Sequence, residues 1–208
     1  MNPELQTYIR QEIIPRYRHF DPAHQEDHVR TVIDQSLALA THYDVDEDIV
    51  YTIAAYHDTG LVEGREKHHI VSARIIREDA TLRRYFTPEQ IDIMADAAED
   101  HRASSYHAPR TIYGRIVAEA DRIIDGPTIV RRTIQYGLNH YPELDKEGHW
   151  RRFLDHMAEK YAEGGYLKLW IPESPNAGRL HAFQQLLKDR AATRKLFDEQ
   201  WELLHNYL

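Results

Sequence analysis

Apolar residues recur at every third or fourth position along most of the chain, which is the spacing of amphipathic α-helices. Between residues 24 and 42, for example, Val29, Val32, Ile33 and Leu37 fall on one helix face. No two segments alternate apolar and polar residues around a hairpin turn, as paired β-strands would. The pattern therefore predicts an all-α protein.

Helix-capping residues and helix breakers divide this pattern into separate elements. Asp46 and Thr87 are suitable N-caps, Gly60 suits a helix end, and the pair Gly126 and Pro127 interrupts the pattern. We expect helices over about residues 4–17, 24–42, 46–58, 66–79, 87–102, 111–124, 128–138, 148–163 and 177–206.

The chain of 208 residues is long enough for one domain with a substantial core. Its character changes after about residue 126, but no Ser/Gly-rich linker marks the change. We therefore expect one domain over residues 1–208, with a helical-bundle core of about 20–126 and a C-terminal helical extension of about 127–208.

The charge of the chain limits the classes of partner that we expect it to bind. Lys and Arg number 26 against 34 Asp and Glu, which gives a net charge of −8, and no Lys/Arg-rich run is present. These features argue against nucleic-acid polymers and membrane surfaces as partners. The amphipathic final helix is compatible with a homodimer as well as with packing inside one chain.

No segment is apolar enough for a membrane span. The longest apolar run, residues 49–56, is much shorter than the ~18 to 20 residues that a span requires. Glu4 and Arg10 fall where a secretory signal would need an uninterrupted apolar stretch. We therefore expect a cytoplasmic protein.

The chain has no cysteine and 14 histidines, so any metal must be bound by nitrogen and oxygen atoms. Six ionisable side chains occupy helix faces that are otherwise apolar. They are His28, His57, Asp58, His69, His101 and Asp121. An isolated charge in such a place costs several kcal/mol or more unless it is paired or bound to a metal.

One divalent ion could satisfy four of these groups at once. The set His28, His57, Asp58 and Asp121 suits Zn, Fe, Mn, Co or Ni, and Mg is also compatible. Each histidine alone could equally be a hydrogen-bonded core residue. The joint placement of all four residues on three separate helices, with His57 and Asp58 together at one helix end, favours a metal site.

Three segments resemble the HD-domain superfamily of metal-dependent phosphohydrolases. They are HVRTV, which begins at His28, AAYHDTGL, which contains His57 and Asp58, and ADR, which contains Asp121. The resemblance covers about residues 20–126 and extends to small single-domain bacterial members through HIVSA at 69–73 and HRASS at 101–105. It implies a bundle of about five core helices, with His28, His57, Asp58 and Asp121 as metal ligands.

The resemblance leaves the number of metal ions at one or two per chain. In binuclear members, extra histidines bind a second metal, and in mononuclear members comparable residues face the substrate phosphate. His69 and His101 are the candidates for either role. His68 is a weaker candidate because it projects about 100° away from His69 on a helix. We interpret His24 as a solvated residue at a helix start, and His149 and His156 as surface residues.

Basic residues near the proposed ligands could bind a phosphate substrate. They are Arg65, Lys67, Arg102 and Arg122. An arginine offers two parallel donors to phosphate oxygens, although each of these residues could also be an ordinary surface charge. Arg102 is the strongest candidate.

The sequence thus predicts a metal-dependent phosphohydrolase that acts on a phosphomonoester or nucleotide-like small molecule. Metal-bound water would be the nucleophile, Asp58 could accept its proton, His101 would bind the phosphate or a second metal, and Arg102 would offset negative charge. Two alternatives stay open. One is an HD-type di-iron oxygenase, and the other is a non-catalytic sensing or scaffold protein with a structural metal.

Overall fold

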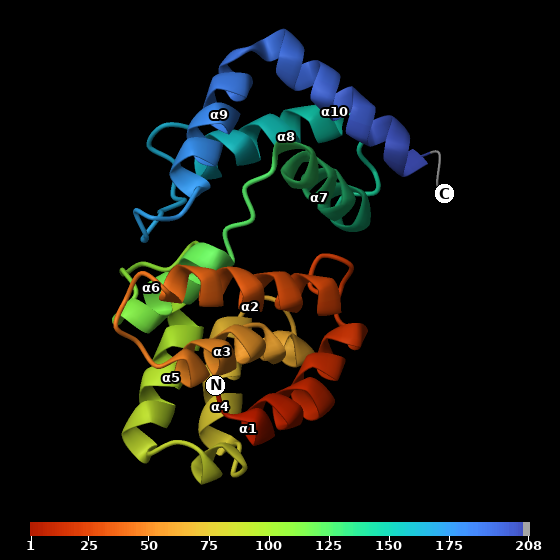
Figure 1. Cartoon of the computed structure of the whole chain (residues 1–208). Helices are drawn as coiled ribbons and strands as arrows, with labels where there is room; N and C mark the ends of the chain where they lie inside the picture. The colour runs from red at the N-terminus through yellow and green to blue at the C-terminus, as the bar shows by residue number, and fades with distance from the viewer. Residues whose placement is uncertain (206–208) are drawn as a thin grey trace. The chain divides into compact units, whose positions relative to one another are not determined.

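The computed structural model describes residues 1–205. Its regular elements are all helical, and no β-strand occurs within this range, which confirms the predicted all-α class (Figure 1). The chain divides into two compact units. The N-terminal unit consists of Met1–Arg122 and Leu169–Ser174, and the C-terminal unit consists of Ile123–Lys168 and the chain from Pro175 onward.

The N-terminal unit contains six α-helices and four shorter helical segments within the described residues. They are α1 (Pro3–Tyr8), the π-helix η1 (Ile9–Ile13), the 3-10 helices η2 (Ile14–His19), η3 (Thr59–Glu63) and η4 (Leu82–Arg84), α2 (Glu26–Ala40), α3 (Glu47–Tyr56), α4 (His68–Glu78), α5 (Pro88–Asp100) and α6 (Ile112–Ala120).

The expected first helix, residues 4–17, changes its type twice. Helix α1 is followed by the π-turn of η1 and then by the 3-10 turns of η2, which contain Pro15. Proline has no N–H group, and its ring clashes with the carbonyl four residues earlier, so regular α-helical hydrogen bonding cannot continue through it.

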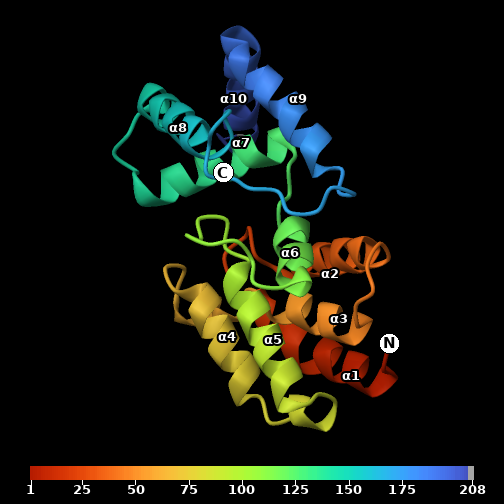
Figure 2. The same ribbon diagram turned by 90° about the vertical axis from the view of Figure 1, so that its left-hand side faces the viewer.

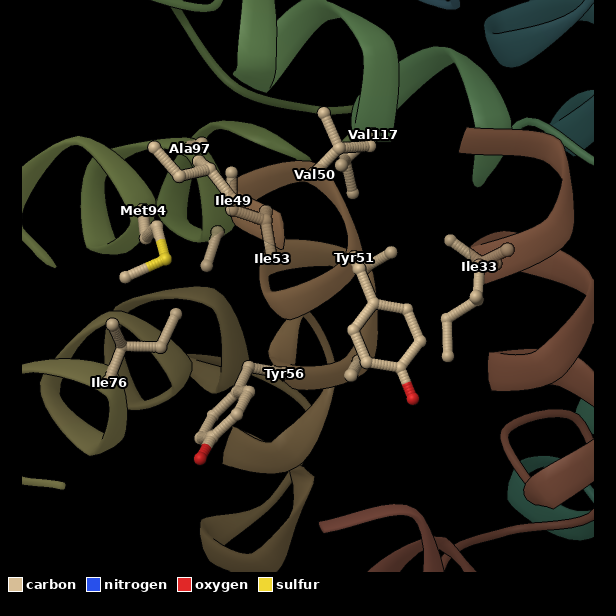
Figure 3. Packing of buried hydrophobic residues seen from close by; sticks show 14 of the residues in the cluster. Ile33, Ile49, Val50, Tyr51, Ile53, Tyr56, Ile76, Met94, Ala97 and Val117 are labelled. Carbon is tan, nitrogen blue, oxygen red and sulfur yellow. The ribbon is translucent and has the colours of Figure 1, made fainter. Parts of the chain in front are cut away.

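Helix α3 is the buried centre of the N-terminal unit. All of its residues from Ile49 to Tyr56 are buried, which explains why the sequence is apolar at every position of this stretch except Thr52. Figure 3 shows Ile53 of α3 among the packed side chains, with Ile33 of α2 and Met94 of α5 on different sides of the helix. The residues that directly follow α3 are consequently held inside the unit.

Helices α4 and α5 run side by side, and α5 also packs against α3 (Figure 2). A capping box between Thr87 and Gln90 begins α5, which confirms the prediction that Thr87 is an N-cap. Asp100, at the end of α5, is 2% exposed and accepts the backbone N–H of Arg110 at 2.7 Å. This bond returns the loop after α5 toward the start of α6.

The segment Leu169–Ser174 belongs to the N-terminal unit although it lies late in the sequence. The buried carboxylate of Glu119 in α6 accepts the backbone N–H groups of Trp170 at 2.6 Å and Ile171 at 3.4 Å. These two hydrogen bonds attach the segment Leu169–Ser174 to α6, near the C-terminal end of that helix.

The C-terminal unit contains α7 (Gly126–His140), α8 (Lys146–Lys160), α9 (Asn176–Lys188) and α10 (Arg190–His205). The expected helix over residues 177–206 is divided at Asp189, whose backbone is extended and whose side chain accepts the N–H of Ala192 at 2.9 Å. An aspartate in this position is a favoured N-cap for a new helix. Residue 206 of that expectation lies outside the described residues.

Two histidines of α8 differ from the expected surface placement. His149 is only 1% exposed, beside Trp201, and Gly137 of α7 leaves room for its ring. His156 is partly buried. The interpretation of His149 as a surface residue is therefore wrong, because a close approach of two helices buries it.

No helix in the described range is sufficiently long and apolar to cross a membrane.

Candidate metal centre

Four predicted ligands converge from three helices of the N-terminal unit. His28 lies in the first turn of α2, His57 and Asp58 directly follow α3, and Asp121 directly follows α6. His28 Nε2 and His57 Nε2 are 3.3 Å apart, and they lie 3.4 and 3.1 Å from Asp58 Oδ2. Asp121 Oδ1 is 3.4 Å from His28 Nε2 and 3.8 Å from His57 Nε2. We call these four residues the first cluster.

A second cluster shares Asp58 with the first. It consists of Asp58, His68 and His101. His68 Nε2 and His101 Nε2 are 3.2 Å apart, and each lies 3.4 Å from Asp58 Oδ1. The two oxygens of Asp58 therefore face different histidine pairs, with Oδ2 in the first cluster and Oδ1 in the second.

The structure places His68 in the second cluster, where the sequence favoured His69. His69 Nδ1 instead accepts a hydrogen bond from Arg102 at 3.4 Å. The cause is the packing of α4 against η3, where Ser72 accepts the N–H of Gly60 at 2.9 Å. Since Gly60 closely follows Asp58, the turn of α4 before Ser72 lies beside Asp58, and within that turn His68 rather than His69 points to Asp58.

Three of the clustered histidines have their ring orientation fixed by a backbone carbonyl three residues earlier. His57 Nδ1 bonds to Ala54 at 2.7 Å, His101 Nδ1 to Ala98 at 2.5 Å and His68 Nδ1 to Arg65 at 2.8 Å. A carbonyl can only accept, so Nδ1 carries the proton in each ring. Nε2 of each neutral ring therefore presents a lone pair to the cluster, as in metal-binding histidines.

The donor atoms fit divalent metal ions. The Nε2 atoms of the two histidine pairs face each other at 3.2–3.3 Å, a separation that either a shared proton or a bound cation stabilises. Ligand atoms about 2.1 Å from one ion stand about 3.0 Å apart at octahedral angles and about 3.4 Å apart at tetrahedral angles. The distances from the histidines to Asp58, 3.1–3.4 Å, fall in that range. Four imidazoles and two carboxylates suit first-row transition ions.

Comparison with known families agrees with this geometry. Residues 26–124 match the model of the HD domain family, a range from the start of α2 to just beyond α6. Residues 26–124 form an HD domain. All members of both clusters lie in this range. No curated protein and no solved structure matches the chain significantly.

HD domains bind divalent metals, and the buried histidine and aspartate groups of this one are compatible with that role. These histidines and aspartates shift one another's pKa values. Burial raises the pKa of Asp58, but the charge of His57 and the hydrogen bond from His101 outweigh burial and hold this pKa well below its ordinary value. Burial likewise raises the pKa of Asp121, but the hydrogen bond from His28 and the adjacent His57 lower it. Both aspartates are therefore ionised at neutral pH.

The histidines of the HD domain respond in opposite directions. Burial lowers the pKa of His28, but hydrogen bonds and negative charge from Asp121 and Asp58 outweigh burial and raise this pKa to about 9. Burial and the adjacent His101 lower the pKa of His68 to about 4. His28 therefore carries a proton at neutral pH when no metal is bound, whereas His68 is already neutral.

The four basic residues near the HD domain's clusters have different surroundings. Arg65 and Lys67 are exposed, and Arg65 lies 3.6 Å from Asp21. Arg122 is 6% exposed, donates to the His101 carbonyl at 2.9 Å and lies 3.6 Å from Asp121 Oδ2. Its side chain supports two ligand-bearing segments from within the domain.

Arg102 connects the segment before α4 with the loop after α5. It donates to the Glu66 carbonyl, to His69 Nδ1 at 3.4 Å and to Ser104 at 3.0 Å. It is the more accessible of the two arginines that follow ligand residues. Its side chain is thus held beside the second cluster by neutral partners.

Two residues outside residues 26–124 contact the clusters. The hydroxyl of Tyr17 in η2 accepts the backbone N–H of Asp58 at 3.2 Å. The ring of His24 lies edge-on to His28, and its Nδ1 lies 2.9 Å from both carboxylate oxygens of Asp21. Tyr17 carries no motif, and its contact depends on tertiary structure, so sequence reasoning did not identify it.

Proposed function

We propose that the protein is a metal-dependent phosphohydrolase that acts on a phosphomonoester or a nucleotide-like small molecule. The observation that supports this proposal is the position of Asp58, whose two oxygens each face a separate histidine pair. His28, His57, Asp58 and Asp121 would hold one ion, and Asp58, His68 and His101 the other. Phosphatases are among the enzymes that use two-metal sites.

The charge of the site supports an anionic substrate. Two divalent ions carry four positive charges, whereas the site supplies two carboxylates and neutral imidazoles. The excess positive charge would attract a phosphate dianion and stabilise the charge that develops during phosphoryl transfer. Bound metal would also supply a nucleophile at neutral pH by lowering the pKa of water from 15.7 toward about 7.

The residues of the chain would divide the remaining tasks. Asp58, whose pKa is well below its ordinary value, would keep both oxygens on the ions and is a poor proton acceptor. Asp121, whose side chain is 22% exposed, is the more accessible carboxylate. Arg102 would offset negative charge on the phosphoryl group, and Arg65 and Lys67, on the segment just before His68, would provide further positive charge.

The test is phosphate release by the full chain loaded with Mn²⁺, Zn²⁺ or Fe²⁺, with p-nitrophenyl phosphate and nucleoside 5′-monophosphates as substrates. We expect turnover that is equal with and without oxygen. Asp58→Asn should abolish turnover, and Asp44→Asn, a change at an exposed aspartate, should leave it intact. Metal-loaded protein that releases no phosphate from these substrates would contradict the proposal.

The second cluster also favours one other function, that of a di-iron oxygenase, because Asp58, His68 and His101 would hold a second ion beside the first. This function requires two irons and consumption of oxygen. Oxygen uptake by the iron-loaded protein in the presence of an organic phosphonate or polyol, without phosphate ester hydrolysis, would support it over the phosphohydrolase.

A further inference from the structure

The end of α3 exchanges its backbone hydrogen bonds for side-chain bonds. In a continuous helix, the Ala54 carbonyl would accept the N–H of Asp58. That carbonyl instead accepts His57 Nδ1 at 2.7 Å. The Asp58 N–H turns to the Tyr17 hydroxyl at 3.2 Å, and this hydroxyl donates to the Ala55 carbonyl at 2.9 Å. Tyr17 thus satisfies two backbone groups that the helix leaves at its end.

Tyr17 is well suited to fix a backbone group. Its side chain is fully buried, and its ring packs edge-on against Phe20 with a centroid distance of 5.2 Å. Its ring centroid is 6.3 Å from that of His57. A buried phenol with one donor bond and one acceptor bond has little freedom to reorient. The peptide group of Asp58 is held equally firmly.

Asp58 is the residue for which such an anchor matters most. Its Oδ1 and Oδ2 face different histidine pairs, so a rotation of the Asp58 backbone displaces one oxygen toward its cluster and the other away. Every other clustered residue contributes to one cluster only. A disturbance of the Asp58 backbone should therefore affect both clusters together.

We propose that Tyr17 is a positioning residue that orients Asp58 for both metal positions at once. The proposal rests on the metal centre of the proposed function and does not depend on phosphate hydrolysis. Tyr17 lies before residues 26–124, so the match to the HD domain family does not include it. Outer partners of metal ligands commonly change metal affinity about 10- to 100-fold when removed.

The test compares Tyr17→Phe with Tyr51→Phe in the full chain. Tyr51 is also buried, in α3, but its hydroxyl has no hydrogen bond to any residue in the described range. Metal-free proteins are titrated with Mn²⁺ in a chelator buffer, and the electron paramagnetic resonance spectrum reports magnetic coupling between two bound Mn²⁺ ions. We expect Tyr17→Phe to weaken Mn²⁺ binding about 10-fold or more at both positions and to change the coupled spectrum.

Tyr51→Phe should bind Mn²⁺ as the wild type does. Wild-type affinity in Tyr17→Phe, or a loss at one position only, would overturn the proposal. Wild-type protein that binds Mn²⁺ but releases no phosphate would contradict the proposed function and leave this result intact. The two failures are therefore distinguishable.

A second measurement applies if Tyr17→Phe does not fold. Amide hydrogen exchange of the wild type is followed with and without Mn²⁺ at Asp58 and at Val50, in the middle of α3. We expect Mn²⁺ to slow exchange at Asp58 more than at Val50, because the Tyr17 bond and the metal would restrain the same peptide group. Equal slowing at both amides would overturn the proposal.

Discussion

The Nε2 atoms of His68 and His101 face each other at 3.2 Å. Both rings bond to backbone carbonyls through Nδ1, so neither Nε2 carries a proton to share when the rings are neutral. Two lone pairs at this distance repel, so the pair needs either a bound cation or a proton. Burial lowers the pKa of His101, but the hydrogen bond and charge of Asp58 outweigh burial and raise it, so a proton can serve in the metal-free protein. A metal ion at this pair would make the centre binuclear.

Removal of His68 should cost the protein one of two metal ions. We expect His68→Ala to retain about one equivalent of metal per chain, held by the first cluster, while the wild type retains about two. His69→Ala is the matched control, since His69 contacts Arg102 and lies outside both clusters. Elemental mass spectrometry after dialysis measures the content. Loss of metal from His69→Ala, with full content in His68→Ala, would contradict the assignment.

The first cluster follows from the sequence because each ligand has a local signal. His28 and Asp121 share a helix face with Val32 and Val117 respectively, one turn away. His57 and Asp58 end the most apolar segment of the chain. Ionisable residues are unusual on apolar helix faces. These positions can therefore be recognised from the sequence without knowledge of the fold.

The second cluster and Tyr17 depend on tertiary contacts that no local pattern contains. The choice between His68 and His69 depends on the bond from Gly60 to Ser72, which sets the face of α4 that meets Asp58. The Tyr17 hydroxyl contacts a backbone group 41 residues away, and a backbone N–H has no sequence signature. The division of the expected helix over residues 177–206 at Asp189 can be predicted from the sequence, because aspartate is a favoured N-cap.

Metal binding should release a proton from His28. Its pKa in the metal-free protein is about 9, so at pH 7.5 the ring is protonated and must lose that proton before Nε2 can bind an ion. We expect the apparent Mn²⁺ affinity to rise about tenfold per pH unit between pH 6.5 and 9 and to level off above. Calorimetry in buffers of different ionisation enthalpy counts the released protons. An affinity that does not change over this pH range would contradict the assignment.

The same shift affects the stability of the metal-free protein. Because the pKa of His28 in the folded state is above its ordinary value of 6.5, its stabilising contribution is complete below pH 6.5 and is lost as the pH rises through 9. We expect the unfolding free energy of the metal-free wild type to fall over this interval relative to that of His28→Asn. Urea unfolding at pH 6 and at pH 9.5 makes the comparison.

The C-terminal unit should lose stability in acid through His156. Burial and the positive charges of Lys160 and Arg152 lower the pKa of His156 to about 4. The unfolded chain therefore takes up this proton more readily, and stability present above pH 6.5 is lost as the pH falls through 4. Because the ring is partly exposed, we expect the loss to be on the order of 1 kcal/mol. His156→Gln should remove this loss, whereas His181→Gln, at an exposed position, should not; urea unfolding at pH 7 and 4 compares them.

Gly60 sets the distance between η3 and α4 and hence the place of His68. A Cβ at this position would lie 2.0 Å from the His68 carbonyl oxygen and 2.6 Å from the Ser72 nitrogen, both of them backbone atoms that cannot rotate away. Gly60→Ala should therefore destabilise the fold by about 3 kcal/mol or more and displace His68 from Asp58. Gly178→Ala is the control, since a Cβ there meets nothing within 4 Å, and in α9 it should stabilise by up to about 1 kcal/mol. Urea unfolding measures the change in stability, and elemental analysis measures the metal content. A Gly60→Ala protein with wild-type stability and about two bound ions would show that α4 can shift without loss of the second cluster.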